Sequence, residues 1–372
     1  MGDLSVIKII CALLTTALIL SGCSGGYAAG ETETAALHPA EPAAAIHRDA
    51  AMASILYCPD NCAVLYGHDI HEKRPIASIT KIMTAIVALE NSDPDKIVTV
   101  TEAMYAEGSS MYLRSGEKLR LREIIKGMLA VSGNDAANAV AIAVGGSTEN
   151  FAALMNRKAA AIGMKNTHFV TPSGLDDDKH YSTAYDMALL CAYAMEKDAF
   201  RDIVSRKSVT VDYVCPEKKQ AVLYNHNSLL SRCEGCIGIK TGYTKKAGRT
   251  LTSCAERNGV RLIVVTLSDG NDWEDHCSLY ETGFMIVKRI CLAPADRRIK
   301  IPSADRNIGT VELVPEKDIC ATVMNGDESR IEERITAPDL IFPQEDKRQA
   351  VGKLEYMLDG KVIACGRLII AE

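Results

Sequence analysis

Residues 75–85 read Pro-Ile-Ala-Ser-Ile-Thr-Lys-Ile-Met-Thr-Ala and place a serine and a lysine at the start of an apolar segment. From Ser78 to residue 89 the apolar residues recur at helical spacing, on a face broad enough for a buried helix. Ser78 and Lys81 are three residues apart, so a helix turns both side chains to one face. The segment therefore predicts a buried helix that begins with these two side chains together.

This pairing is a candidate for nucleophilic catalysis. A serine hydroxyl is a weak nucleophile until a base within hydrogen-bond reach accepts its proton. A lysine that is buried near other cations has a lowered pKa, so the neutral amine of Lys81 can be that base for Ser78. An ordinary helix start with an exposed lysine explains the same four residues, and in isolation that simpler interpretation is favoured.

A second motif, Ser132-Gly133-Asn134, follows an apolar run that predicts an amphipathic helix over residues 119–131. The Ser132 hydroxyl can relay a proton towards a leaving amine, and the Asn134 amide can hold a carbonyl group of a substrate. A turn that caps the following helix is the alternative, and such turns are frequent. Both interpretations can hold at once.

A third motif, Lys240-Thr241-Gly242, lies between candidate strands. Lys240 and Thr241 offer a charge and a hydroxyl to a carboxylate, and Gly242 lets the backbone come close to a ligand. The backbone N–H groups of Ser78 and Tyr243 would then form an oxyanion hole. The alternative is an exposed strand with a glycine bulge.

The N-terminal residues predict export. Lys8 precedes an apolar run over residues 9–20, which has the length of a signal-peptide core and is too short to span a bilayer. The run ends in Leu20-Ser21-Gly22-Cys23, which resembles a bacterial lipobox. We therefore expect a signal peptide at 1–22 and a lipid on Cys23, although a plain secretory signal near residues 28–29 is the alternative. Either way the protein is exported, to the outer face of the cytoplasmic membrane or to the cell wall.

Bulk composition excludes several partners and cofactors. The net charge of -6 over 372 residues argues against a nucleic-acid partner. No H-E-x-x-H zinc motif occurs, and the 13 cysteines give no clean set of four ligands, so we expect no metal and no cofactor. Cys58/Cys62 and Cys233/Cys236 are close in sequence. Buried or free thiols are the favoured interpretation, with disulfides left open.

The remaining chain predicts an α+β fold in two folded domains. Residues 23–45 are rich in Gly, Ala, Glu, Thr and Pro and predict a flexible tether. Strands flank a helical block over 46–293, which favours an antiparallel sheet with helices. Residues 294–372 have short β-type runs, and Asp359-Gly360 is a strong hairpin signal, so we expect a small all-β domain. The candidate helices are 78–89, 119–131, 136–144, 151–162 and 183–195, and the candidate strands include 209–211, 249–254, 260–267 and a hairpin over 53–66.

The three motifs and the segments between them resemble the serine D-Ala-D-Ala carboxypeptidases, the low-molecular-weight penicillin-binding proteins of peptidase type S11. The resemblance covers residues 50–372. One departure is Ile237, where the family often has Asp before Gly238. The matching blocks are 75–85, 132–138, 163–169, 174–176, 180–184, 238–244 and 247–249.

The resemblance implies a penicillin-binding/β-lactamase-like domain and a reaction. Ser78 would be the acyl-ester nucleophile, Lys81 the proton acceptor and Ser132 an aid to proton transfer, while Lys240 would bind the substrate's terminal carboxylate. The family removes the terminal D-alanine from peptidoglycan stem pentapeptides by acylation and hydrolysis, and β-lactam antibiotics trap the ester. The implied partners are the stem peptide, β-lactams and, through Cys23, the membrane.

A β-lactamase and a non-catalytic cell-wall-binding protein are the two alternative functions. A β-lactamase would share these motifs, but a class A enzyme needs a glutamate for deacylation, and residues 165–174 hold no carboxylate. A non-catalytic cell-wall-binding protein would need broken motifs, and all three are intact. The sequence therefore favours the carboxypeptidase.

Overall fold

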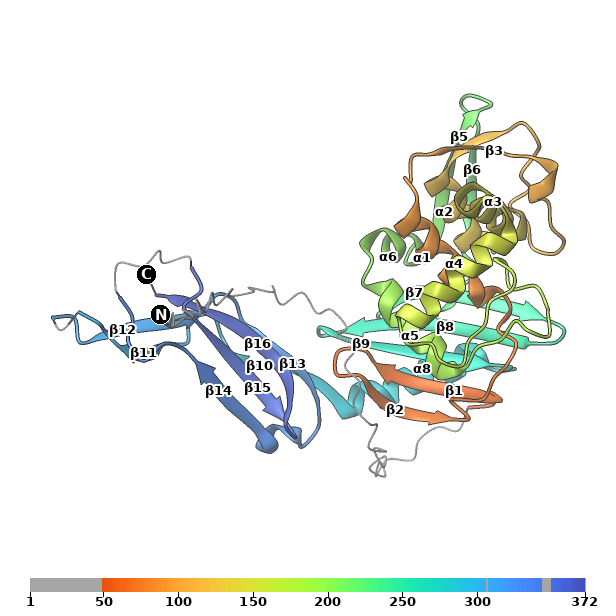
Figure 1. Ribbon diagram of the computed structural model, residues 1–372. Helices are drawn as coiled ribbons and strands as arrows, with labels where there is room; N and C mark the ends of the chain where they lie inside the picture. Colours follow the sequence, from red (N-terminus) through yellow and green to blue (C-terminus); the bar gives the residue numbers. More distant parts are fainter. Residues whose placement is uncertain (1–48, 306, 343–348, 372) are drawn as a thin grey trace, which may run out of the picture.

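The computed structural model describes residues 49–305, 307–342 and 349–371, in two parts joined by a narrow β ribbon (Figure 1). The larger part is built on a five-stranded antiparallel sheet in the order β2-β1-β9-β8-β7. The predicted signal peptide, the predicted tether and Cys23 lie outside the described residues. The strands of this sheet are β1 (Ala53–Cys58), β2 (Ala63–His68), β7 (Cys236–Thr244), β8 (Gly248–Arg257) and β9 (Val260–Leu267).

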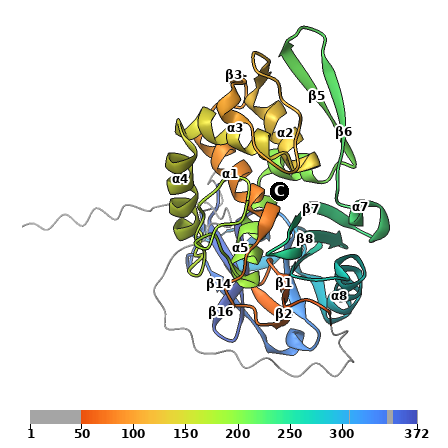
Figure 2. The same cartoon turned by 90° about the vertical axis from the view of Figure 1, so that its right-hand side faces the viewer.

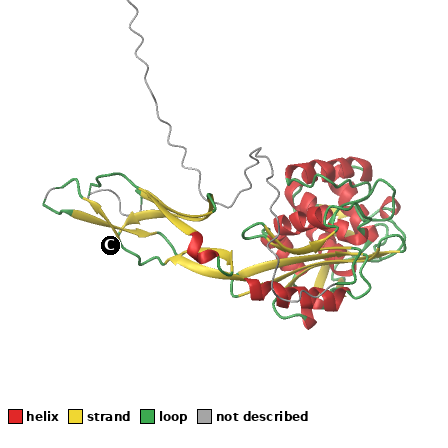
Figure 3. Cartoon of the chain, turned by 90° about the horizontal axis from the view of Figure 1, so that it is seen from below, coloured by secondary structure: helices red, strands yellow, loops and turns green. Residues whose placement is uncertain are grey.

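Helices cover both faces of this sheet, and β9 shows why. Ile263 and Val265 pack into the core beneath the main helical block, whereas Leu262 and Val264 pack into a second core against α8. Successive strand residues point to opposite faces, so a strand that is apolar throughout needs cover on both sides. Figure 2 shows α5 and α8 on opposite sides of the sheet, and Figure 3 shows helices on both sides of the strands.

The helical block contains the predicted helices, with shifted ends. The serine of the first motif lies in a 3₁₀ turn, η1 (Ala77–Thr80), and the α-helix begins only at Lys81, so the single helix predicted over 78–89 is corrected to two segments. We assigned no helix to the stretch that forms α8. The α-helices are α1 (Lys81–Asn91), α2 (Leu121–Val131), α3 (Asn134–Gly145), α4 (Thr148–Ala161), α5 (Ala184–Met195), α6 (Asp198–Val204), α7 (Leu229–Arg232) and α8 (Asp272–Ile286).

A smaller antiparallel sheet packs on the helical block, and its last two strands project as a hairpin (Figure 1). The strands, in sheet order, are β3 (Ile97–Thr99), β4 (Lys118–Arg120), β5 (Ser208–Cys215) and β6 (Gln220–Tyr224). A short 3₁₀ turn, η2 (Glu102–Met104), follows β3. None of the helices in the described part of the chain is long and apolar enough to cross a membrane.

The C-terminal part is all β, with its own core around Leu313, Leu354 and Leu368. Asp359 and Gly360 have φ angles of 50° and 75°, the pair of positive values that a two-residue hairpin turn requires, and they join β15 to β16 as predicted. β10 follows α8 directly and pairs with β13. The elements are β10 (Val287–Ala293), β11 (Ile299–Pro302), β12 (Thr310–Pro315), β13 (Ile319–Met324), η3 (Asp327–Arg330), β14 (Ile331–Thr336), β15 (Gly352–Leu358) and β16 (Lys361–Ile370).

Neither of the cysteine pairs left open above is bridged. Cys58 is buried, and the Cys62 thiol points to the Pro59 carbonyl. The Cys236 thiol donates to the Gly238 carbonyl at 3.3 Å, while Cys233 contacts Cys277 on α8. Closeness in sequence is therefore a poor guide to which thiols meet in this fold.

Candidate active site

The first motif places a lysine amine against a serine hydroxyl. In a 3₁₀ turn residues i and i+3 eclipse each other, and Lys81 Nζ lies 2.9 Å from Ser78 Oγ. The lysine side chain is fully buried. Burial, and then the charge of Lys240, hold the pKa of Lys81 well below its usual value, while Asp135 acts in the opposite direction. The site therefore favours the neutral amine that can accept a proton.

The other contacts of Lys81 leave its lone pair free once the amine is neutral. Its Nζ donates to the Asn134 side-chain carbonyl and to the Ser173 backbone carbonyl, each at 2.7 Å. A neutral amine has two N–H groups and one lone pair. The two carbonyl groups occupy the two N–H groups, so the lone pair is left for the Ser78 hydroxyl.

The second motif is a tight turn between α2 and α3. Ser132 has a φ of 61°, in the left-handed region, and ends α2, and α3 begins at Asn134. The turn is compatible with the functional interpretation, because Ser132 also lines the cavity described below. Asn134 bonds Lys81 through its carbonyl, and its amide donates to the Glu107 carbonyl at 2.6 Å. In this structure Asn134 orients the lysine.

Asp135, the next residue, was not predicted as part of the site. Its buried carboxylate accepts from the backbone N–H groups of Met111 at 2.8 Å and Leu113 at 3.0 Å, and from the Ser110 hydroxyl at 2.7 Å. It thereby fixes the loop that carries Ser109 to the cavity wall. An acidic residue directly after the motif, in the first turn of an apolar helix, was the available signal.

The third motif lies within β7, which corrects its predicted place between strands. Gly242 comes so close to the nucleophile that a Cβ atom there would lie 2.9 Å from the Ser78 backbone nitrogen and 2.4 Å from Thr250 Oγ1. Such spacing is too short for any side chain. Glycine is therefore needed here because β7 passes directly beside η1.

Lys240 does not reach the solvent. Its side chain is 2% exposed, and Nζ donates to the Thr241 carbonyl at 2.8 Å. Burial lowers the pKa of Lys240 to about 7. Its charge lies close enough to Lys81 to lower the pKa of that residue too.

A cavity of about 520 Å³ joins the three motifs. Five of the predicted site residues line it: Ser78, Ser132, Thr241, Gly242 and Tyr243. Three other predicted site residues are buried behind the residues that line the cavity: Lys81, Asn134 and Lys240. Six further residues line it that were not among the predicted site residues, although Arg249 ends the matching block 247–249: Ser109, His226, Arg249, Thr250, Asp272 and Trp273.

Arg249 contributes a guanidinium group to the wall of this cavity. Its side chain is 41% exposed, against 2% for Lys240. Asp272 holds it through two contacts, one of them from Nε to Oδ2 at 3.1 Å, and the Trp273 ring lies 5.4 Å below the guanidinium. Paired and stacked in this way, the arginine keeps a fixed orientation with a positive charge at the cavity wall.

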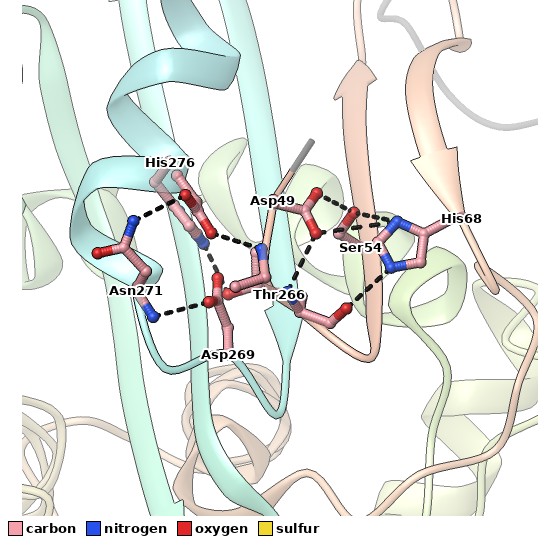
Figure 4. Close-up of polar contacts among 10 residues, drawn as sticks. Asp49, Ser54, His68, Thr266, Asp269, Asn271 and His276 are labelled. Carbon is pink, nitrogen blue, oxygen red and sulfur yellow. Dashed lines mark hydrogen bonds and ion pairs between the residues drawn. The ribbon is translucent and has the colours of Figure 1, made fainter. Parts of the chain in front are cut away.

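A Ser-His-Asp group lies away from the cavity, where the described residues begin (Figure 4). The Ser54 hydroxyl is fully buried and lies 2.5 Å from an Asp49 carboxylate oxygen. His68 binds the Ala51 carbonyl through Nε2 at 2.9 Å and lies 3.2 Å from Ser54 through Nδ1. Because the buried serine hydroxyl donates to the aspartate, it is not poised as a nucleophile, and the group ties Asp49 to β1 and β2.

No group of three or more His, Cys, Asp or Glu side chains in the described ranges is arranged to hold a metal ion. The site consists of a serine, a lysine, backbone N–H groups and fixed charges. Such a set can acylate the serine and stabilise an oxyanion. This set of groups is typical of an acyl-transfer enzyme.

Comparison with known proteins agrees with this chemistry. A family model described as D-alanyl-D-alanine carboxypeptidase matches residues 39–271, and one described as the C-terminal domain of penicillin-binding protein 5 matches residues 294–372. The chain is 30% identical over 377 residues to the D-alanyl-D-alanine carboxypeptidase DacF of Bacillus subtilis, covering 96% of this chain and 92% of the relative.

Further relatives extend the agreement to solved structures. The D-alanyl-D-alanine carboxypeptidase DacA of Escherichia coli is 30% identical over 334 residues, covering 83% of this chain and 80% of that protein. The structure of penicillin-binding protein 5 from Haemophilus influenzae superposes with a TM-score of 0.66 at 28% identity, covering 88% of this chain and 98% of that chain. The chain therefore belongs to the D-alanyl-D-alanine carboxypeptidase family, the serine peptidases of family S11.

Proposed function

We propose that this serine D-Ala-D-Ala carboxypeptidase removes the terminal D-alanine from peptidoglycan stem pentapeptides through an ester on Ser78. The observation that carries the proposal is the 2.9 Å contact between Lys81 Nζ and Ser78 Oγ inside a buried, cation-rich site. The lone pair of the neutral lysine accepts the serine proton as the oxygen attacks the peptide carbonyl.

Acylation needs a place for the developing negative charge. The backbone N–H groups of Ser78 and Tyr243 would bind the oxyanion. The close approach of Gly242 to the Ser78 nitrogen supports this, because it brings the β7 backbone beside the nucleophile. As the tetrahedral intermediate collapses, the carbon–nitrogen bond breaks and the leaving amine takes a proton by way of Ser132. Water then hydrolyses the ester with Lys81 as base.

The substrate's terminal carboxylate needs a cation that it can touch. We assign the direct contacts to Arg249 and the Thr241 hydroxyl, since both line the cavity. Lys240, for which the resemblance implied direct binding, is buried and donates to the Thr241 carbonyl. It would act from behind the strand, by orienting Thr241 and by lowering the pKa of Lys81.

A β-lactamase is disfavoured by the same cavity. Rapid hydrolysis of the acyl-enzyme in a class A enzyme needs a carboxylate free to activate water. Among the described residues that line the cavity the carboxylate is Asp272, and Arg249 engages both of its oxygens. β-Lactams should therefore acylate Ser78 and leave slowly, as inhibitors.

The nucleophile assignment is tested with Ser78→Ala, assayed for D-alanine release from a pentapeptide and for labelling by a fluorescent penicillin. Both signals should vanish while the circular dichroism spectrum is kept. Ser208→Ala, an exposed serine on β5, is the matched control and should retain both activities. Labelling that persists in Ser78→Ala would refute the assignment.

Attachment to the membrane is a separate proposal. The chain belongs to a family of cell-wall-acting D-alanyl-D-alanine carboxypeptidases, which act outside the cytoplasm, and we propose that a lipid on Cys23 holds it there. The Leu20-Ser21-Gly22-Cys23 sequence supports the proposal. Expressed with labelled palmitate, the wild type should carry label in the membrane fraction and Cys23→Ser should not. Equal labelling of both proteins would contradict it.

A further inference from the structure

Cys291 and Cys320 face each other across the β10–β13 ribbon. They are direct partners in its antiparallel register. Directly opposed residues in such ribbons have Cα atoms about 4.5–5.5 Å apart, and disulfides span Cα distances of about 4.4–6.8 Å. Opposed side chains also share one face of the ribbon. The two cysteine side chains lie close enough to interact.

Both thiols can be reached from solvent. Cys291 is exposed and Cys320 is partly exposed. By contrast Cys191 and Cys254 are fully buried in the catalytic core. Thiol–disulfide exchange requires access for an incoming sulfur along the S–S axis. The Cys291/Cys320 pair meets this requirement on an open ribbon.

The pair lies on β10 and β13, the ribbon that connects the two parts of the enzyme (Figure 1). β10 continues directly from α8 of the catalytic part. β13 is held to the catalytic part by Thr322, whose hydroxyl donates to the Asp60 carboxylate in the β1–β2 turn at 2.9 Å. A covalent link between the strands would fix this ribbon without touching the cavity.

We propose that Cys291 and Cys320 are a redox-active thiol pair that closes to an intramolecular disulfide by exchange with an external disulfide. One thiolate attacks a sulfur of the incoming disulfide, which forms a mixed disulfide and releases one thiol. The second cysteine then attacks the protein sulfur of that mixed disulfide and releases the other thiol. Two S–H bonds are lost and one S–S bond forms, and the two electrons and two protons leave on the released thiols.

The test maps the link in the purified full chain. The protein is incubated with oxidised glutathione, its remaining thiols are alkylated, and it is digested with trypsin without reduction. Trypsin yields residues 290–297 around Cys291 and 318–330 around Cys320. Mass spectrometry should find these two peptides joined, with two hydrogens fewer than their summed mass, and a reductant should separate them.

Variants decide whether the link is specific. In Cys291→Ser and in Cys320→Ser the joined peptide should disappear, whereas Cys215→Ser, which removes an exposed thiol on β5, should leave it intact. Oxidation should raise the thermal midpoint of the wild type but not of Cys291→Ser, because the link closes a loop in the unfolded chain. Acylation of Ser78 by penicillin should stay within about twofold in both states. Separately alkylated or glutathionylated Cys291 and Cys320, or a link from either to another cysteine, would overturn the proposal.

Discussion

Replacing Gly242 by alanine tests the close approach of β7 to the nucleophile. The added methyl would lie 2.4 Å from Thr250 Oγ1, 2.9 Å from the Ser78 nitrogen and 3.1 Å from the Ile79 nitrogen. The contact with Thr250 can be relieved by a side-chain movement, but Thr250 is itself held to the Ile76 carbonyl at 3.1 Å. The two backbone contacts can be relieved only if η1 and β7 separate.

The expected cost follows from these contacts. Overpacking a tight site destabilises a protein by about 1–3 kcal/mol, and loss of one oxyanion-hole donor lowers an acyl-transfer rate by about 10²–10³-fold. Gly242→Ala should therefore lower the free energy of unfolding, measured in urea, by about 1–3 kcal/mol. The second-order rate constant for acylation by a fluorescent penicillin should fall about 10²–10³-fold.

Two further variants separate the causes. Adding Thr250→Ala to Gly242→Ala should restore part of the stability but not the acylation rate, because the backbone clash with Ser78 remains. Gly270→Ala is the matched control, since a Cβ atom there meets nothing within 4 Å. A folded Gly242→Ala enzyme that acylates within about threefold of the wild type would refute the placement of the oxyanion hole.

Three further outcomes are expected. Lys81→Ala should lower acylation by at least about 10³-fold with the fold kept, measured by penicillin labelling and circular dichroism; labelling at the normal rate would remove lysine as the base. Arg249→Gln should raise KM for a D-Ala-D-Ala peptide more than it lowers kcat, and an unchanged KM would contradict its contact with the carboxylate. Asp269 (Figure 4) has its pKa raised to about 6, first by burial and then by neighbouring carboxylates, and its Oδ2 has no hydrogen-bond partner. The folded state therefore binds the proton more tightly than the unfolded state, so stability rises as pH falls through 6 towards 4. Asp269→Asn should be more stable than the wild type at pH 7.5, by at most about 3 kcal/mol in urea unfolding. A gain that does not shrink at pH 4 would contradict this.

Local patterns predicted the parts of the site that depend on short sequence separations. Ser78 and Lys81 were found because three residues bring them together in any helical turn. The strand that carries Lys240 was considered only as an alternative, because Gly238 and Gly242 weaken its strand signal. Pairing with β8 along its length overrides that preference.

The missing residues depend on contacts between distant segments. Arg249 becomes a fixed cation only because Asp272 and Trp273, at the start of α8, fold against β8. Asp135 acts by holding backbone N–H groups of a preceding loop. Asp135 directly follows the second motif and Arg249 ends a block that resembles the family, but the contacts that give these residues their roles join distant segments and follow no local pattern. The same holds for Cys291 and Cys320, which only the β10–β13 register brings together.

The central claim is that Ser78 carries the acyl group, and mapping the adduct tests it most directly. After brief exposure to penicillin at neutral pH, tryptic digestion should place the mass of the opened antibiotic on residues 74–81, with fragment ions that assign it to Ser78. The adduct should be absent from Lys81→Ala over the same time. An adduct on any other residue, or full labelling of Ser78 without the lysine, would contradict the account.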